Sequence, residues 1–219
     1  MIELKRDNYR NLDWLQQYLA GHKGFICGGC FKNILNNEKV KDLDIFFRNI
    51  RDWEDAVQYF DERSVGYGFK PDQLTEEDAE YVFHYENEKV KAYKNLKTGM
   101  RIELCRAIFG EPKEIIDNFD FTITKFAYYK EEVKNEDDED SHIETKLICC
   151  DDFFEHLHLK RLVIDDEIPY PMSTFERMLR YAKYGYFPCK ETKIKLLKAI
   201  NGLPEEQIEV SESLYKGID

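Results

Sequence analysis

The chain has 219 residues, a formal net charge of −12 and a sequence pI of about 5.0. This length fits one large domain, or one domain with a small appendage, and 42% hydrophobic residues are enough to form a core. Because phosphate neutralisation dominates nucleic-acid affinity, the acidic balance argues against a general nucleic-acid-binding protein, although it leaves room for a local basic strip.

The N-terminus and the cysteines indicate a cellular compartment. Met1 to Arg6 lead directly into a polar segment rather than into a signal peptide, and no apolar run is long enough to span a bilayer. The chain contains six cysteines. We therefore predict a cytoplasmic protein with reduced thiols and no membrane partner.

The first third of the chain mixes helical and strand patterns. Apolar residues at helical spacing predict a helix from Asp7 to Ala20, with Asp7 as its N-cap. A short apolar run predicts a buried strand that Gly28-Gly29 ends. The further elements predicted up to residue 63 are a helix at 30–35, a strand at 43–47 and a helix at 52–63.

The middle of the chain is rich in strand patterns. Strands are predicted at 80–85, 90–94, 100–106, 119–129 and 143–149, with a short helix at 112–118. Between the last two strands, Glu131 to Ser141 form a highly acidic stretch. Like charges in such a block repel one another, so we predict a solvated, mobile hairpin loop.

The pattern becomes helical after residue 150. Ser173 and Glu176 have the spacing of a capping box, and Gly185 would end that helix. A second helix would close at Gly202. We therefore predict an α+β fold, with a mixed sheet flanked by helices in a palm-like head domain at 1–150 and a short helical neck-like region at 151–219.

One group of residues has the pattern of a site that binds nucleotide phosphates and a divalent metal. Gly28-Gly29 precede a predicted helix, and Asp42-Leu43-Asp44 follow on a predicted strand. Two glycines let backbone amides approach a triphosphate, and the helix offers its positive dipole end. Residues two apart on a strand share one face, so Asp42 and Asp44 project together. Adjacent carboxylates of this kind are ligands for Mg²⁺ or Mn²⁺.

A third carboxylate is expected from a neighbouring strand. Glu103 stands between apolar residues on a predicted strand and is the first choice as metal ligand or general base. Asp120, in Phe119-Asp120-Phe121, is its rival. Both alternatives stay open at this point.

These residues resemble the DNA polymerase beta-like nucleotidyltransferase superfamily. Phe25 to Gly29 followed by Asp42-Leu43-Asp44 look like its signature. The segment 120–128, DFTITKFAY, and the segment 175–187, FERMLRYAKYGYF, look like the RRDFTINAMAYD segment and the neck helix of bacterial-type tRNA nucleotidyltransferases and poly(A) polymerases. The resemblance covers most of residues 24–187 and implies the nucleotidyltransferase fold.

The resemblance also implies roles for individual residues. Asp120 would contact the nucleotide ribose, and the neck-helix residues Arg177 and Arg180 would contact phosphate or base. Gly28, Gly29 and Lys32 would complete the nucleotide-binding set, with Asp42, Asp44 and Glu103 as catalytic residues and metal ligands.

The chain also departs from the family pattern. Lys32-Asn33 stand where the family has Arg-Asp, and Asn118-Phe119 replace its paired arginines. About thirty residues follow Phe187, fewer than the family's tail domain needs. We therefore expect an activity other than tRNA end repair.

Two smaller patterns have alternative interpretations. Cys27 and Cys30 form a C-x-x-C that could serve zinc or redox chemistry, or could simply flank a tight turn. His156 and His158 could bind metal only with further ligands, and a solvated helix end is the favoured interpretation.

The leading hypothesis is an enzyme, a metal-dependent nucleotidyltransferase. It would transfer a nucleoside monophosphate from a nucleoside triphosphate to a hydroxyl of an RNA 3′ end, a protein or a small molecule, and release pyrophosphate. A compact enzyme of this kind suits a phage or mobile element. The alternative is a non-catalytic nucleotide- or partner-binding protein on the same fold, which the residues at 32–33 and 118–119 favour.

Overall fold

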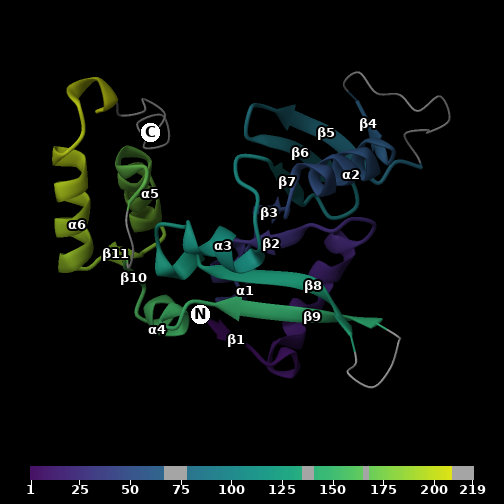
Figure 1. The fold of residues 1–219 in the computed structure, drawn as a ribbon, viewed down its shortest axis with the longest axis horizontal. Helices are drawn as coiled ribbons and strands as arrows, with labels where there is room; N and C mark the ends of the chain where they lie inside the picture. The colour runs from purple at the N-terminus through teal and green to yellow at the C-terminus, as the bar shows by residue number, and fades with distance from the viewer. Residues whose placement is uncertain (67–77, 135–140, 165–167, 209–219) are drawn as a thin grey trace. The chain divides into compact units, whose positions relative to one another are not determined.

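The computed structural model describes residues 1–66, 78–134, 141–164 and 168–208 (Figure 1). The chain divides into two compact units. The first contains residues 1–118 and 125–150, and the second contains residues 119–124 and 151–219.

The first unit is built on a mixed sheet. In its described residues nine strands lie in the order β1-β9-β8-β2-β3-β7-β6-β5-β4. Two neighbouring pairs, β3 with β7 and β4 with β5, are parallel, and the other pairs are antiparallel. The strands are β1 (Ile2–Glu3), β2 (Phe25–Cys27), β3 (Asp42–Phe46), β4 (Ser64–Val65), β5 (Tyr81–Glu86), β6 (Val90–Asn95), β7 (Arg101–Cys105), β8 (Phe126–Lys134) and β9 (Ser141–Cys149).

Helices accompany this sheet, which confirms the predicted α+β class. They are the 3₁₀ helix η1 (Arg6–Leu19), α1 (Cys30–Leu35), α2 (Ile50–Asp61) and α3 (Pro112–Asp117). The helix α2 packs on β4 and β7. Its Trp53 is buried and donates its indole N–H to the Leu104 carbonyl at 3.2 Å.

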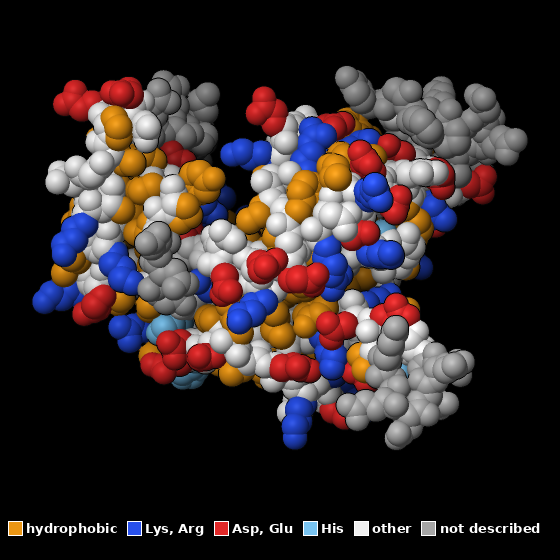
Figure 2. All heavy atoms as spheres, in the orientation of Figure 1, with side chains coloured by type: hydrophobic (Ala, Val, Ile, Leu, Met, Phe, Trp, Pro, Cys, Tyr) orange, Lys and Arg blue, Asp and Glu red, His pale blue; other side chains and the backbone are white. Residues whose placement is uncertain are grey.

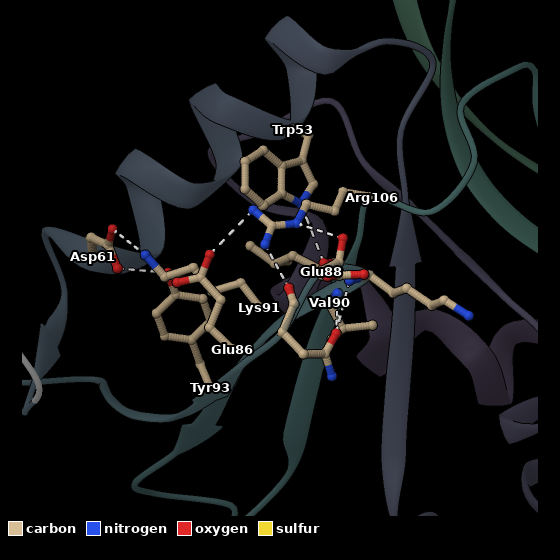
Figure 3. A network of polar contacts seen from close by, with 11 residues as sticks. Trp53, Asp61, Glu86, Glu88, Val90, Lys91, Tyr93 and Arg106 are labelled. Atoms are coloured by element: carbon tan, nitrogen blue, oxygen red, sulfur yellow. Dashed lines mark hydrogen bonds and ion pairs between the residues drawn. The ribbon is translucent and has the colours of Figure 1, made fainter.

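A polar network fastens the β5–β6 hairpin to β7 and α2 (Figure 3). The Arg106 guanidinium donates to the carbonyls of Asn87 and Glu88, pairs with Glu86 at 3.2 Å and lies over the Trp53 ring. Asp61, at the end of α2, accepts hydrogen bonds from Lys91 Nζ at 2.7 Å and from the Tyr93 hydroxyl at 2.6 Å. The contacts of Asp61 thus join α2 to β6, the strand that pairs with β7.

The predicted strand at 119–129 is wrong in its first half. Residues Thr122–Thr124 form a short 3₁₀ helix, η2, and β8 begins at Phe126. The reason is local hydrogen bonding, because Asp120 Oδ1 accepts from the Phe121 N–H and Thr124 Oγ1 donates to the Phe121 carbonyl. Short polar side chains of this kind compete with a sheet ladder for backbone groups.

Two predicted helix caps are also wrong. The helix η1 begins one residue before Asp7, and Asp7 instead accepts a hydrogen bond from Arg10. The helix α5 (Pro171–Lys183) begins at Pro171, so Ser173 lies inside its first turn and contacts Arg177. Proline at the first helical position needs no hydrogen bond from its nitrogen, which explains the earlier start.

The strands β8 and β9 form the predicted hairpin. They pair in antiparallel register from Phe126–Cys149 to Lys134–Ser141. The mobile loop predicted at 131–141 is wrong at both ends, because Glu131 to Lys134 belong to β8 and Ser141 begins β9, where the backbone groups pair across the hairpin. The acidic residues 135–140 between them lie outside the described residues.

The second unit is mainly helical. Beside η2 and α5 it contains α4 (Phe153–His158), β10 (Arg161–Leu162), β11 (Phe187–Pro188), α6 (Lys190–Asn201) and the 3₁₀ turn η3 (Glu205–Gln207). The helix α5 packs on α6, and the two short strands pair in parallel. Apolar side chains gather on the surface over α5 and α6 (Figure 2). None of the helices in the described part of the chain has the length and apolar character needed to cross a bilayer.

Candidate functional site

The centre of the sheet brings the three predicted carboxylates together. In the parallel register of β3 with β7, Asp44 lies opposite Glu103 and Asp42 lies opposite Arg101. Leu43 and Ile102, the residues between them, are fully buried. Since side chains alternate along a strand, Asp42, Asp44, Arg101 and Glu103 all project from one face of these two strands.

The electrostatics of this cluster are unfavourable for three full negative charges. Burial, followed by the charges of Glu103 and Asp42, raises the pKa of Asp44 to about 8. Asp44 and Glu103 also share a hydrogen bond. At neutral pH this carboxyl pair therefore holds one proton, which is the usual result when two carboxylates occupy one site.

Arg101, on β7, places a positive charge beside these carboxylates. Its guanidinium pairs with Asp42, and its Nε lies 2.8 Å from Glu103 Oε1. This second contact is an ion pair without the alignment of a hydrogen bond. Arg101 was given no role from the sequence, although its spacing of two residues from Glu103 already places both on one face of a strand.

Tyr85 is a second neighbour that the sequence did not reveal. It lies opposite Ala92 in the β5–β6 pairing, and Ala92 lies opposite Glu103 in the next pairing. Burial and a hydrogen bond with Glu103 raise the pKa of Tyr85 to about 12. Tyr85 is therefore a neutral donor to the Glu103 carboxylate at physiological pH.

The donor set suits a hard divalent cation, but it is not arranged around one. Mg²⁺ and Mn²⁺ prefer carboxylate oxygens, and three carboxylates converge here. Among the residues that the structure describes, no group of three or more His, Cys, Asp or Glu side chains is disposed to hold a metal ion. The Arg101 guanidinium instead joins Asp42 and Glu103.

The glycine turn follows directly after a neighbouring strand. Cys27, the last residue of β2, lies opposite Asp44. Gly28 then adopts a φ of +101°, which is strained for any residue with a Cβ. Its N–H donates to the Phe126 carbonyl at 3.1 Å, so this particular amide is used by the sheet.

Lys32, one of the predicted nucleotide-binding residues, points into the protein. Its side chain is buried, donates to Asn33 Oδ1 and pairs with Glu38 at 3.7 Å. A phosphate contact by Lys32 would need this pairing to be broken.

The remaining predicted nucleotide-binding residues lie in the second unit. Asp120 is buried and its Oδ2 lies 3.1 Å from Arg177 Nε, again as an ion pair without hydrogen-bond alignment. Arg177 also donates to Ser173 Oγ at 3.0 Å, and Arg180 is exposed on the same helix. Glu103, rather than Asp120, is thus the register partner of Asp44.

The cysteines and histidines form no second centre in the described residues. All six cysteines are free, and burial raises the pKa of Cys27, Cys30 and Cys105 well above the ordinary value. Such thiols are protonated and inert. The predicted solvated helix end is wrong for His156, which is buried and hydrogen-bonded to Thr122 Oγ1 at 2.8 Å, while His158 is exposed.

Comparison with protein families gives one match that covers most of the chain. A model described as "Gad2: Gabija anti-defense 2 family protein" matches residues 5–160. The search of curated proteins gives no match.

Solved structures share the fold. "The complex structure of CCA-adding enzyme with CTP" is similar to this chain at a TM-score of 0.55 and 18% identity, over 92% of this chain and 46% of that one. A Thermotoga maritima CCA-adding enzyme complexed with tRNA matches at 0.50 and 17%, over 89% and 42%. A "tRNA-processing enzyme (apo form I)" matches at 0.50 and 17%, over 94% and 52%. The chain spans about half the length of these proteins, and the similarity confirms the nucleotidyltransferase-type fold.

Proposed function

This chain belongs to the Gabija anti-defense 2 family, and we propose that it is a metal-dependent nucleotidyltransferase. It would transfer a nucleoside monophosphate from a nucleoside triphosphate to a hydroxyl group. The observation that carries this proposal is the parallel register of β3 with β7, which places Asp42, Asp44 and Glu103 on one face.

Asp42, Asp44 and Glu103 would hold Mg²⁺ or Mn²⁺. The bound metal would lower the pKa of the acceptor hydroxyl and offset the charge that develops on the leaving pyrophosphate. Because Asp44 and Glu103 share a proton in the metal-free protein, this pair must lose that proton before all three carboxylates can act as ligands.

Glu103 is the proposed general base. The acceptor oxygen would form a bond to the α-phosphorus while the bond from that phosphorus to the bridging oxygen of the β-phosphate breaks. The hydroxyl proton would pass to the Glu103 carboxylate, and pyrophosphate would leave. The neighbouring Tyr85 hydroxyl would orient that carboxylate.

Four further residues, together with the turn at Gly28-Gly29, would bind the nucleotide. The turn at Gly28-Gly29 lies next to the carboxylates through the pairing of Cys27 with Asp44. We assign phosphate binding to this turn and to Lys32, ribose binding to Asp120, and phosphate or base binding to Arg177 and Arg180. Of these, Asp120 and Arg177 already pair with each other.

The family name suggests the biological setting. The acceptor would belong to, or be required by, the Gabija defence system, and modification of its hydroxyl group would counter that defence. The similar CCA-adding enzyme from Thermotoga maritima is complexed with tRNA. An RNA 3′ end is therefore one candidate acceptor, and a protein hydroxyl group is another.

Label transfer tests this proposal. The protein would be incubated with each α-³²P-labelled nucleoside triphosphate and Mg²⁺ or Mn²⁺, in extracts of cells with and without Gabija. We expect label on a macromolecule with wild type and with the exposed-surface control Asp55→Asn, and at least a hundredfold loss with Asp42→Asn or Glu103→Gln. Equal labelling by all four proteins would overturn the assignment.

A second candidate function is binding without catalysis. The ion pairs of Arg101 favour it, because they neutralise the carboxylates without a metal. Under this alternative, Asp42→Asn and Glu103→Gln would keep full activity against Gabija in cells, and no triphosphate would be consumed.

A further inference from the structure

The carboxylate cluster carries its own cation. Arg101 contacts Asp42 through one terminal nitrogen and Glu103 through Nε, so one guanidinium bridges two of the three carboxylates. Its side chain remains 36% exposed. The Arg101 side chain therefore extends from β7, is partly exposed to solvent, and places its guanidinium between two of the proposed metal ligands.

We propose that Arg101 is a built-in counter-cation that a divalent metal must displace. This inference rests on the proposed function, since it concerns the same three carboxylates. In the metal-free protein the guanidinium limits the repulsion among Asp42, Asp44 and Glu103. When the metal is bound, Arg101 leaves Asp42 and Glu103 and turns toward solvent.

Geometry and charge both require this exchange. A cation shared by Asp42 and Glu103 would occupy the space between their oxygens, which the guanidinium now bridges. A guanidinium that stayed there would also repel the divalent ion at short range. The partial exposure of Arg101 gives it a route to solvent that does not require any strand to move.

The consequence is a lower metal affinity than three carboxylates would otherwise give. Arg101 competes with the metal for two ligands, so its removal should tighten binding. Two partly exposed ion pairs are a modest barrier, and their loss predicts an increase in affinity of about tenfold. A residue with a purely structural role would loosen the site or leave it unchanged on removal.

The experiment is a Mn²⁺ titration of the full chain without nucleotide at pH 8, followed by the electron paramagnetic resonance signal of free Mn²⁺. Arg101→Gln removes the charge, and Arg101→Lys keeps a charge but loses the fork that reaches both carboxylates. The matched control is Arg48→Gln, because Arg48 has a comparable partly exposed pairing, with Glu111, outside the cluster.

We expect about tenfold tighter Mn²⁺ binding in Arg101→Gln, a smaller gain in Arg101→Lys, and wild-type affinity in Arg48→Gln. In EDTA, Arg101→Gln should melt below wild type, and saturating Mn²⁺ should raise its melting temperature by more than that of wild type. If Arg101→Gln does not fold, Arg101→Lys alone decides, and an affinity equal to or weaker than wild type refutes the inference.

The outcomes separate this inference from the proposed function. Mn²⁺ affinity that is unchanged or weakened in Arg101→Gln overturns the inference alone. Tighter binding without any label transfer overturns the nucleotidyltransferase proposal and leaves Arg101 as a counter-cation. A wild-type protein that binds no Mn²⁺ overturns both.

Discussion

Replacing Asp44 by asparagine should stabilise the metal-free protein at pH 8. The folded protein raises the pKa of Asp44 from 3.8 to about 8, whereas the unfolded chain has the ordinary value. Between these two pH values the folded state binds more protons than the unfolded state, so stability falls as pH rises. Asparagine carries no charge and should avoid this loss.

The magnitude follows from the size of the shift. A displacement from 3.8 to about 8 corresponds to an upper limit of roughly 6 kcal/mol. Asp44 is only half-buried, so solvent screening reduces this figure, and we expect a gain of about 1–2 kcal/mol at pH 8. For a chain of this size that raises the melting temperature by roughly 2–8 °C.

The assay is thermal unfolding in EDTA across pH 4 to 8, on wild type and Asp44→Asn. The difference should be near zero at pH 4 and should grow toward pH 8. Addition of Mg²⁺ should stabilise wild type and have little effect on Asp44→Asn. A variant that is less stable than wild type at pH 8, or a gain that does not depend on pH, would refute the reasoning.

Three further predictions concern the scaffold of the site. Asn49→Ala removes the side chain that caps α2 by accepting the Asp52 N–H, and should cost about 1 kcal/mol in urea unfolding. Arg106→Ala removes contacts to Glu86 and to two carbonyls, and should cost about 1–3 kcal/mol, measured by the same urea unfolding. Gly28→Ala places a Cβ at a φ of +101° and should cost about 1–2 kcal/mol and lower transfer, whereas an unchanged melting temperature would show that the turn adapts freely.

Much of the site could be predicted because it depends on strand periodicity. Asp42 and Asp44 share a face for the same reason that any residues two apart do, and the apolar flanks of Glu103 indicated a half-buried strand. The pairing of β3 with β7 could not be predicted from strand periodicity. Three strands, β4 to β6, intervene along the chain, and only tertiary packing decides which strand becomes the neighbour of β3.

Other parts of the chain could not be predicted for a different physical reason. Residues 119–125 have strand-forming side chains, but the hydrogen bonds of Asp120 and Thr124 to the nearby backbone favour a tight turn. Arg101 was missed because a basic residue at the start of a strand is ordinary in sequence. The role of Arg101 depends on Asp42, which lies 59 positions away in the chain and opposite Arg101 in the sheet.

The raised pKa of Asp44 bears on whether the carboxylate cluster is structural or functional. A structural ion pair lowers the pKa of its carboxylate, since the pairing favours the charged form. Here burial and two neighbouring carboxylates outweigh Arg101, and the pKa rises instead. The hydrogen bonds of β3 to β2 and β7 hold the three side chains together in spite of this cost. An arrangement that opposes folding has the character of a binding site for the proposed divalent cation, because a protein that needed only stability would do better with asparagine at position 44.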